Sequence, residues 1–223
     1  MTDTKLLIKK MISIIDTFPM SNREETVSSK EEQLIKKHEF QWDFFLQNEK
    51  GKPKDRFTYD YIFEEYIREI VFNCTNIDLL REPGLNWAFI RKYEASGRAK
   101  LEPHFDSDEY TVNIMLSEPS EYKGGEFIYC PSKYYKESKD INIDEKKKLI
   151  NRLLSEGNAF KLKPEMGETI VLAGQYQNNL EPNLHCVFPV TEGKRYVLCL
   201  FFDKTCNSLA NKIINLYNEK KLN

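Results

Sequence analysis

The stretch Arg195-Tyr-Val-Leu-Cys-Leu-Phe-Phe202 has the β-branched and aromatic composition of a β-strand. Side chains alternate between the two faces of a strand, so Val197, Cys199 and Phe201 share a face with Arg195. Arg195 therefore places a positive charge on an otherwise apolar face. A guanidinium in an apolar cavity needs an anion, and a dicarboxylate ligand could supply one through a bidentate contact.

Four shorter runs of the same composition lie upstream, separated by clusters of Gly, Pro and Asn. They cover residues 87–93, 111–116, 126–129 and 168–172. Several short strands with turn residues between them are typical of an antiparallel sandwich or barrel, and not of alternating βα units. We therefore expect a mainly β core with helices (α+β) over residues 86–204.

Helical patterns flank and interrupt this core. Apolar residues recur at helical spacing in several places: Leu7, Met11, Ile14 and Ile15; Leu34, His38, Trp42 and Phe45; residues 59–72; and Leu209, Ile213, Leu216 and Tyr217. We expect helical support over residues 1–80, a C-terminal helix over 205–223, and a charged helical insertion at about 131–157. The insertion helix is expected to begin at an Asp144 N-cap and to stop at Gly157.

Length and charge limit the function classes. A chain of 223 residues can bury one sizeable core, and we expect a single domain over 1–223. The net charge is −2, and no extended basic stripe is present, which argues against a nucleic-acid partner. No apolar run approaches the ~20 residues of a membrane span, and the first residues make a poor signal peptide, so we expect a cytoplasmic protein.

Cysteine use agrees with that compartment. Five cysteines are present, with no CxxC pair among them: Cys74, Cys130, Cys186, Cys199 and Cys206. An odd number without paired spacing favours reduced thiols over a disulfide framework or a cysteine-based zinc site.

Two of the three histidines belong to a candidate metal site. His104 and Asp106 stand two residues apart just before a strand, so they point to the same face in extended chain. His185 follows far downstream, ten residues before Arg195. Two histidines and one carboxylate form the facial triad of non-haem Fe(II) oxygenases, which leaves three coordination positions open for a chelating cosubstrate and O₂. Asp108 and Glu109 are nearby acidic alternatives to Asp106.

The ordered motifs resemble one enzyme family. They are Tyr93 with Pro103-His104-Phe105-Asp106; Thr111-Val-Asn-Ile-Met-Leu116; Tyr122-Lys-Gly-Gly-Glu-Phe127; Gly167-Glu-Thr-Ile-Val-Leu172; and His185-Cys-Val-Phe-Pro-Val-Thr-Glu-Gly-Lys-Arg195-Tyr. Over about residues 86–204 the chain is similar to the Fe(II)- and 2-oxoglutarate-dependent dioxygenases, specifically the prolyl 4-hydroxylase and procollagen-lysyl-hydroxylase branch. The ending after His185 is especially close to the lysyl-hydroxylase pattern.

The resemblance implies a double-stranded β-helix, or jelly roll. By this matching His104, Asp106 and His185 hold Fe(II), Arg195 pairs with the distal carboxylate of 2-oxoglutarate, and Tyr93 and Asn113 line the cosubstrate pocket. O₂ is the second cosubstrate, and ascorbate is a further candidate cofactor. The implied reaction hydroxylates an unactivated C–H bond and releases succinate and CO₂.

The sequence leaves three functions open: two kinds of hydroxylase substrate and a non-catalytic role. A lysyl or prolyl side chain of a protein or peptide is preferred. A free amino acid or other small molecule is the alternative, because the core motifs do not separate the two. A non-catalytic binding module on the same fold would show a damaged triad or lack the anion partner, and neither is seen here. The aromatic stretch 129–135 is either a substrate surface or part of a half-buried hairpin.

Overall fold

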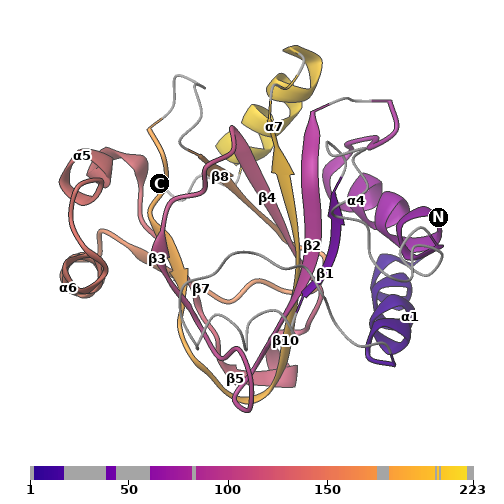
Figure 1. Cartoon of the computed structure of the whole chain (residues 1–223), viewed down its shortest axis with the longest axis horizontal. Coiled ribbons are helices and arrows are strands. Elements are labelled where there is room, and N and C mark those ends of the chain that lie inside the picture. Colours follow the sequence, from indigo (N-terminus) through magenta and orange to yellow (C-terminus); the bar gives the residue numbers. More distant parts are fainter. Residues whose placement is uncertain are drawn as a thin grey trace.

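Two antiparallel sheets form the core of the computed structural model (Figure 1). The structure describes residues 3–17, 39–43, 61–81, 84–174, 181–203, 205 and 207–219. The larger sheet has six strands: β1 (Glu39–Asp43), β2 (Leu85–Glu94), β10 (Val190–Phe202), β4 (Tyr110–Met115) and β8 (Thr169–Ala173) in that order, with β5 (Tyr122–Gly124) beside β10. The smaller sheet orders β3 (Leu101–His104), β9 (His185–Val187), β6 (Phe127–Tyr129) and β7 (Phe160–Leu162).

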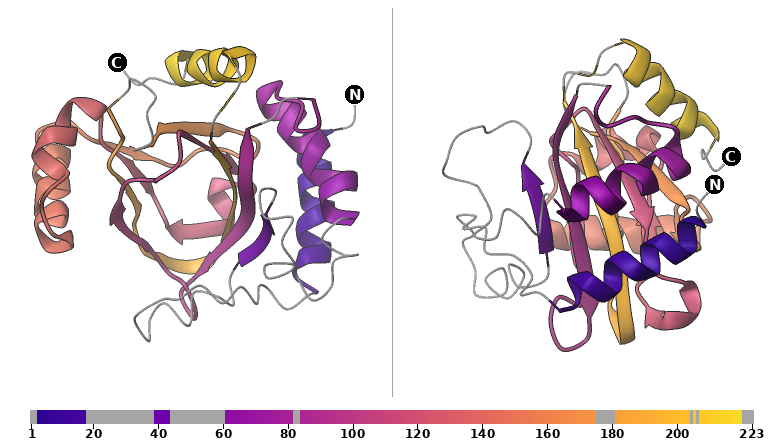
Figure 2. Two further views of the ribbon diagram at one scale, coloured as in Figure 1. Left: turned by 45° about the horizontal axis from the view of Figure 1, so that its top comes forward. Right: turned by 90° about the vertical axis from the view of Figure 1, so that its right-hand side faces the viewer.

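Helices cover the outer faces of both sheets. On the side of the larger sheet lie α1 (Thr4–Ile15), the π-helical segment η2 (Phe63–Ile67), α4 (Arg68–Thr75) and α7 (Asn207–Glu219). The insertion forms η4 (Ser132–Tyr134), α5 (Tyr135–Ser138) and α6 (Ile143–Ser155) beside the smaller sheet, and η3 (Pro119–Glu121) precedes β5. The left view in Figure 2 shows α6 on the opposite side of the sheets from α1 and α4. None of the helices in the described ranges is long and apolar enough to cross a membrane.

The buried apolar residues form three clusters, of which the two on either face of β10 are separated by strand alternation and the third lies between the smaller sheet and α6. We call the apolar layer between the larger sheet and helices α1, α4 and α7 the outer core; β10 contributes Tyr196, Leu198, Leu200 and Phe202 to it. The inner core lies between the two sheets and takes the other face of β10, namely Val197, Cys199 and Phe201. The two-residue period of a buried strand therefore decides which side chains reach the space between the sheets.

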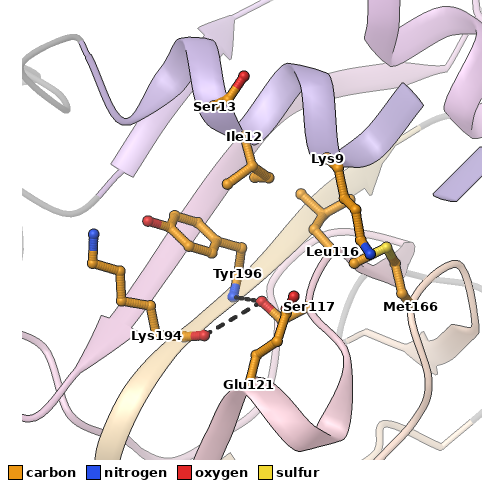
Figure 3. A pocket seen from close by; sticks show the side chains of 9 residues that line it. All are labelled: Lys9, Ile12, Ser13, Leu116, Ser117, Glu121, Met166, Lys194 and Tyr196. Carbon is orange, nitrogen blue, oxygen red and sulfur yellow. Dashed lines mark hydrogen bonds between the residues drawn. The ribbon is translucent and has the colours of Figure 1, made fainter. Parts of the chain in front are cut away.

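Helix α1 is attached to the larger sheet near both of its ends. Lys5 forms an ion pair with Glu118 at 2.9 Å, and Asp16 accepts hydrogen bonds from the Tyr196 hydroxyl and from Lys194. Between these contacts the helix lies over an open hollow, shown in Figure 3, with Ile12 and Ser13 on the helix side. On the sheet side the Ser117 hydroxyl accepts a hydrogen bond from the Tyr196 amide at 2.8 Å.

Several element predictions are confirmed. All five predicted strands are present, as are the amphipathic helix that ends near Phe72 and the C-terminal helix, where Leu209 and Ile213 are fully buried. The four described cysteines, Cys74, Cys130, Cys186 and Cys199, are free thiols. Leu34, His38, Phe45 and Cys206, as well as the side chain of Tyr217, lie outside the described residues.

Four details of the prediction are wrong. The segment through Trp42, expected to be a helix, is the edge strand β1, which pairs with β2. Its sequence Glu-Phe-Gln-Trp-Asp also alternates between polar and apolar residues, as a strand does. The last strand begins at Val190 and not at Arg195, because it continues upstream to pair with β5.

The other two corrections concern local boundaries. The N-cap of α6 is Asn142, whose side chain accepts from the Glu145 amide in a capping box, so Asp144 lies inside the helix. His104 ends strand β3 and does not precede a strand directly. Pro103 is tolerated there because β3 is an edge strand, where a missing backbone donor costs little.

Candidate metal centre

Three ligand-type side chains meet between the two sheets. His104 and His185 are direct partners in the β3–β9 pairing, and their ring centroids lie 4.2 Å apart. Asp106 lies two residues beyond β3, with Oδ1 at 3.4 Å from His104 Nε2 and Oδ2 at 3.6 Å from His185 Nε2. Of the residues that the structure describes, these three form the cluster whose donor atoms all lie within 4.8 Å of one another.

Backbone carbonyls fix the orientation of both imidazoles. His104 Nδ1 donates to the Glu102 carbonyl at 2.8 Å, and His185 Nδ1 donates to the Asn183 carbonyl at 3.0 Å. A carbonyl only accepts, so Nδ1 of each ring carries a proton and Nε2 faces Asp106. This arrangement is the usual support for histidines that bind a metal.

Burial and charge set the protonation states of the two buried ligands. Burial lowers the pKa of His185 to about 4, against the opposing effect of Asp106, so the ring is neutral at pH 7. Burial raises the pKa of Asp106, but His185, His104 and the Thr111 hydroxyl together outweigh burial and lower it far below its usual range. Asp106 is therefore a carboxylate, and beside it the cluster offers the neutral imidazole of His185.

The loop that carries Asp106 is held by its neighbours. Thr111 Oγ1 donates to Asp106 Oδ2 at 2.6 Å, and the Glu109 amide donates to the Phe202 carbonyl. The two acidic alternatives are used elsewhere: Asp108 accepts from Asn86, and Glu109 accepts from Thr205. Neither of these carboxylates lines the cavity described next.

A narrow cavity extends from the three ligands into the inner core. The side chains that line it come from both sheets: Phe89, Arg91, Tyr93, Leu101, His104, Asp106, Thr111, Asn113, Phe127, His185, Val187, Arg195, Val197, Cys199 and Phe201. All six residues predicted from the sequence for the site, His104, Asp106, His185, Arg195, Tyr93 and Asn113, line this one cavity. His104 is the more solvent-exposed of the two histidines, with 34% of its side chain exposed against 3% for His185.

Arg195 is a buried cation with unused hydrogen-bond donors. Its side chain is 1% exposed, and neither Nε nor Nη1 has a hydrogen-bond partner, while Nη2 lies 3.3 Å from the Met115 sulfur. The guanidinium carbon is 5.2 Å from the centre of the Tyr93 ring, because Tyr93 is its cross-strand partner on β2. Burial raises the pKa of Tyr122, and the nearby Arg195 partly offsets this shift. Such a group is complementary to an anion.

Sequence reasoning missed four residues that shape the site. Thr111 holds Asp106, Phe127 stacks on His185 with centroids 5.6 Å apart, and Arg91 lies at the cavity with its guanidinium 4.4 Å from the Phe89 ring centre. Asn183 is fully buried and orients His185 through its carbonyl. Strand periodicity could have identified Arg91, because it lies two residues from both Phe89 and Tyr93 and therefore shares their face of β2.

Comparison with known proteins gives similar sequences and folds. No family model matches the chain. Residues of this chain are 25% identical over 142 positions to the procollagen lysyl hydroxylase and glycosyltransferase of Acanthamoeba polyphaga mimivirus. The match covers 63% of this chain but only 12% of that protein, so the chain spans about an eighth of its curated relative.

Solved structures that were matched to this chain include two prolyl hydroxylases. The Trichoplax adhaerens prolyl hydroxylase, solved with a hypoxia inducible factor peptide, gives a TM-score of 0.45 at 12% identity and covers 98% of this chain and 82% of that one. A prolyl-4-hydroxylase of Pseudomonas putida gives 0.42 at 13% identity, covering 90% and 86%.

Proposed function

We propose that this chain is an Fe(II)- and 2-oxoglutarate-dependent dioxygenase on a double-stranded β-helix, hydroxylating a lysyl or prolyl side chain of a protein or peptide. One observation carries the proposal. A buried guanidinium with two unpartnered nitrogens faces the same narrow cavity as two imidazoles and one carboxylate. The first feature calls for an anionic ligand, and the second calls for a divalent metal.

The three ligand side chains fit ferrous iron. Two imidazole nitrogens and one carboxylate oxygen suit Fe(II), and a set of three leaves further positions for a cosubstrate. Both imidazoles present Nε2 without any change of tautomer, because Nδ1 already donates to a carbonyl. His104, Asp106 and His185 would hold the ion.

The residues deeper in the cavity fit 2-oxoglutarate. This cosubstrate is a dicarboxylate, and Arg195 would take the carboxylate remote from the metal through its unpartnered nitrogens. Tyr93 and Asn113 border the same space from β2 and β4. When bound, the iron would activate O₂, with one oxygen atom used in the oxidative decarboxylation of 2-oxoglutarate to succinate and CO₂ and the other in the hydroxylation of the substrate.

The protein itself contributes the orientation of the ligands and the exclusion of water from the site. Aromatic rings of the inner core pack beside the ligands: Trp87 stacks on Phe201 with centroids 4.5 Å apart, and Phe127 stacks on His185. This apolar wall keeps water away from one side of the reacting centre. The more exposed side, at His104, is where a peptide side chain would reach the metal.

The choice of a lysyl or prolyl side chain rests on sequence. The segment from His185 to Tyr196 follows the lysyl-hydroxylase pattern, and the curated relative carries that activity in its name. A small-molecule hydroxylase has the same metal and cosubstrate residues, so the substrate assay must include both classes.

The first test adds Fe(II) and 2-oxoglutarate to the metal-free protein without oxygen and records the visible absorption spectrum. We expect a metal-to-ligand charge-transfer band that is lost in His185→Ala. Arg195→Ala should need about 10- to 100-fold more 2-oxoglutarate for the same band, because it loses hydrogen bonds to a charged group. Lys194→Ala is the matched control, since it removes an exposed charge from the same strand.

Absence of the band in folded wild-type protein would overturn the dioxygenase assignment. If the band forms, succinate release is measured with lysyl- and prolyl-containing peptides and with free amino acids. Peptide-dependent succinate supports the proposed substrate, whereas release with free amino acids alone overturns the substrate and leaves the cofactor assignment in place.

A further inference from the structure

Thr111 links the larger sheet to the one candidate ligand that no strand holds. Thr111 is the second residue of β4, is 1% exposed, and lines the cavity between the sheets. Its hydroxyl donates to Asp106 Oδ2 at 2.6 Å. On either side its cross-strand partners are Phe201 of β10 and Leu172 of β8, so its own position is fixed by the sheet.

The three candidate ligands differ in how they are oriented. His104 and His185 lie in strands, and each ring is also held by a carbonyl. Asp106 lies in the loop after β3, where no ladder sets its direction. A carboxylate on a loop is free to turn about its χ angles unless a hydrogen bond stops it, and the Thr111 hydroxyl provides that bond.

The contact leaves the carboxylate facing both imidazoles. Oδ1 lies near His104 Nε2, and Oδ2 lies near His185 Nε2 while it accepts the Thr111 proton. A hydroxyl of threonine can donate once and is fully buried here, so water does not compete for this bond. The carboxylate is therefore held in place before any ion arrives.

We infer that Thr111 is a positioning residue for the metal: it fixes the Asp106 carboxylate in the orientation that completes the three-ligand set. The inference rests on the proposed function, because it needs a metal at this site. Partners of this kind typically change metal affinity by 10- to 100-fold when they are removed.

A purely structural role for the hydroxyl is the competing explanation. Elsewhere in the chain Thr75, also buried, donates to the Val71 carbonyl at the same distance of 2.6 Å. Thr75 lies in α4 and does not line the cavity. Thr75→Val therefore removes a buried threonine hydrogen bond of equal length without touching a ligand, and serves as the matched control.

The experiment measures Co²⁺ binding to the full chain by competition with a chelating dye, and records the visible spectrum of the Co²⁺ complex. We expect Thr111→Val to bind Co²⁺ at least about 10-fold more weakly and to shift the Co²⁺ absorption bands. Thr111→Ser, which restores the hydroxyl, should return both readouts close to wild type. Thr75→Val should lower thermal stability but leave affinity and spectrum unchanged.

The outcomes distinguish the positioning role of Thr111 from the existence of the metal site itself. Co²⁺ binding by Thr111→Val with wild-type affinity and spectrum would overturn the positioning role and leave the metal site intact. Failure of the wild type itself to bind Co²⁺ would overturn the metal site and, with it, the proposed function. Should Thr111→Val not fold, Thr111→Ala removes the same hydroxyl with a smaller side chain and is expected to show the same loss.

Discussion

At the scale of single residues, the energetics of Arg195 are unusual. Burying a charged group costs free energy unless hydrogen bonds and an opposite charge compensate for it. Two nitrogens of the Arg195 guanidinium lack a hydrogen-bond partner in the buried interior. The arginine is therefore expected to lower the stability of the ligand-free protein in return for anion binding.

Arg195→Met tests this balance. Methionine has a similar length and no charge, so we expect the free energy of unfolding of the ligand-free protein to stay equal or to rise by about 1–3 kcal/mol. Urea denaturation measures it. With metal present in both proteins, added 2-oxoglutarate should stabilise the wild type more than the variant. A loss of stability in the variant would mean that the guanidinium is already satisfied within the protein.

The pKa of His185 predicts how stability depends on pH. Burial lowers this pKa from 6.5 to about 4, so the unfolded chain takes up the proton more readily than the folded one. The free energy of unfolding should therefore fall as the pH drops from about 6.5 towards 4, by up to about 1.4 kcal/mol per pH unit from this residue. Above pH 6.5 its contribution is constant.

Chemical denaturation at several pH values checks this prediction. His185→Asn should flatten the slope between pH 6.5 and 4, since it removes the titrating group. A slope that is the same in the variant would assign the pH dependence to other residues.

At the scale of elements, the loop between β3 and β4 depends on a close approach by the end of β8. A Cβ atom added at Gly174 would lie 1.9 Å from the Asp108 carbonyl oxygen and 3.2 Å from that of Asp106. The Gly174 amide also donates to the Glu109 carbonyl at 3.1 Å. The absent side chain of Gly174 therefore lets the backbone of the ligand-bearing loop pack against the sheet.

Gly174→Ala is expected to lower the free energy of unfolding by about 3 kcal/mol and to weaken metal binding, because backbone atoms must move. Gly157→Ala is the control. Gly157 follows α6 at a φ of +71°, with no atom within 4 Å of an added Cβ, so the cost there is only about 1 kcal/mol of backbone strain. Equal losses in the two variants, seen by thermal denaturation, would contradict the close-packing argument.

The sequence allowed accurate prediction where a strand is buried on both faces. The parity of Arg195, Val197 and Phe201 correctly placed the guanidinium in the inner core, and Cys186 lies on the opposite face from His185, as adjacent strand residues must. Prediction failed at edges. The five residues of β1 satisfy a helical and a strand period alike, and only pairing with β2 decides between them.

The end of β3 illustrates a second limit. Pro103 discourages a strand, yet its place at a sheet edge makes it acceptable, and edge position is a property of the assembled sheet. For the same reason the role of Thr111 could not be found from spacing: its contact with Asp106 depends on how the loop returns towards β4.

At the scale of the whole molecule, the two faces of β10 serve different purposes, one for stability and the other for the site. The outer face of β10 packs against helices, whereas the inner face borders the cavity. Substitutions on the two faces should therefore have different consequences.

Leu198→Ala tests this separation. Leu198 is fully buried in the outer core, so we expect a loss of about 2–5 kcal/mol in the free energy of unfolding, measured by urea denaturation. The Co²⁺ affinity of the folded variant should stay within about twofold of wild type. A large loss of affinity in a folded variant would show that the outer core also controls the ligands.

The hollow beneath α1 has an evolutionary consequence. The helix is secured near both ends by Lys5 and Asp16, while Ser13 and Ile12 border open space between them (Figure 3). A side chain that borders open space can grow without displacing a neighbour, in contrast to the crowded positions around Gly174. Among descendants of this sequence, mutations should accumulate more freely at Ser13 than at the inner-facing positions of β4 and β10.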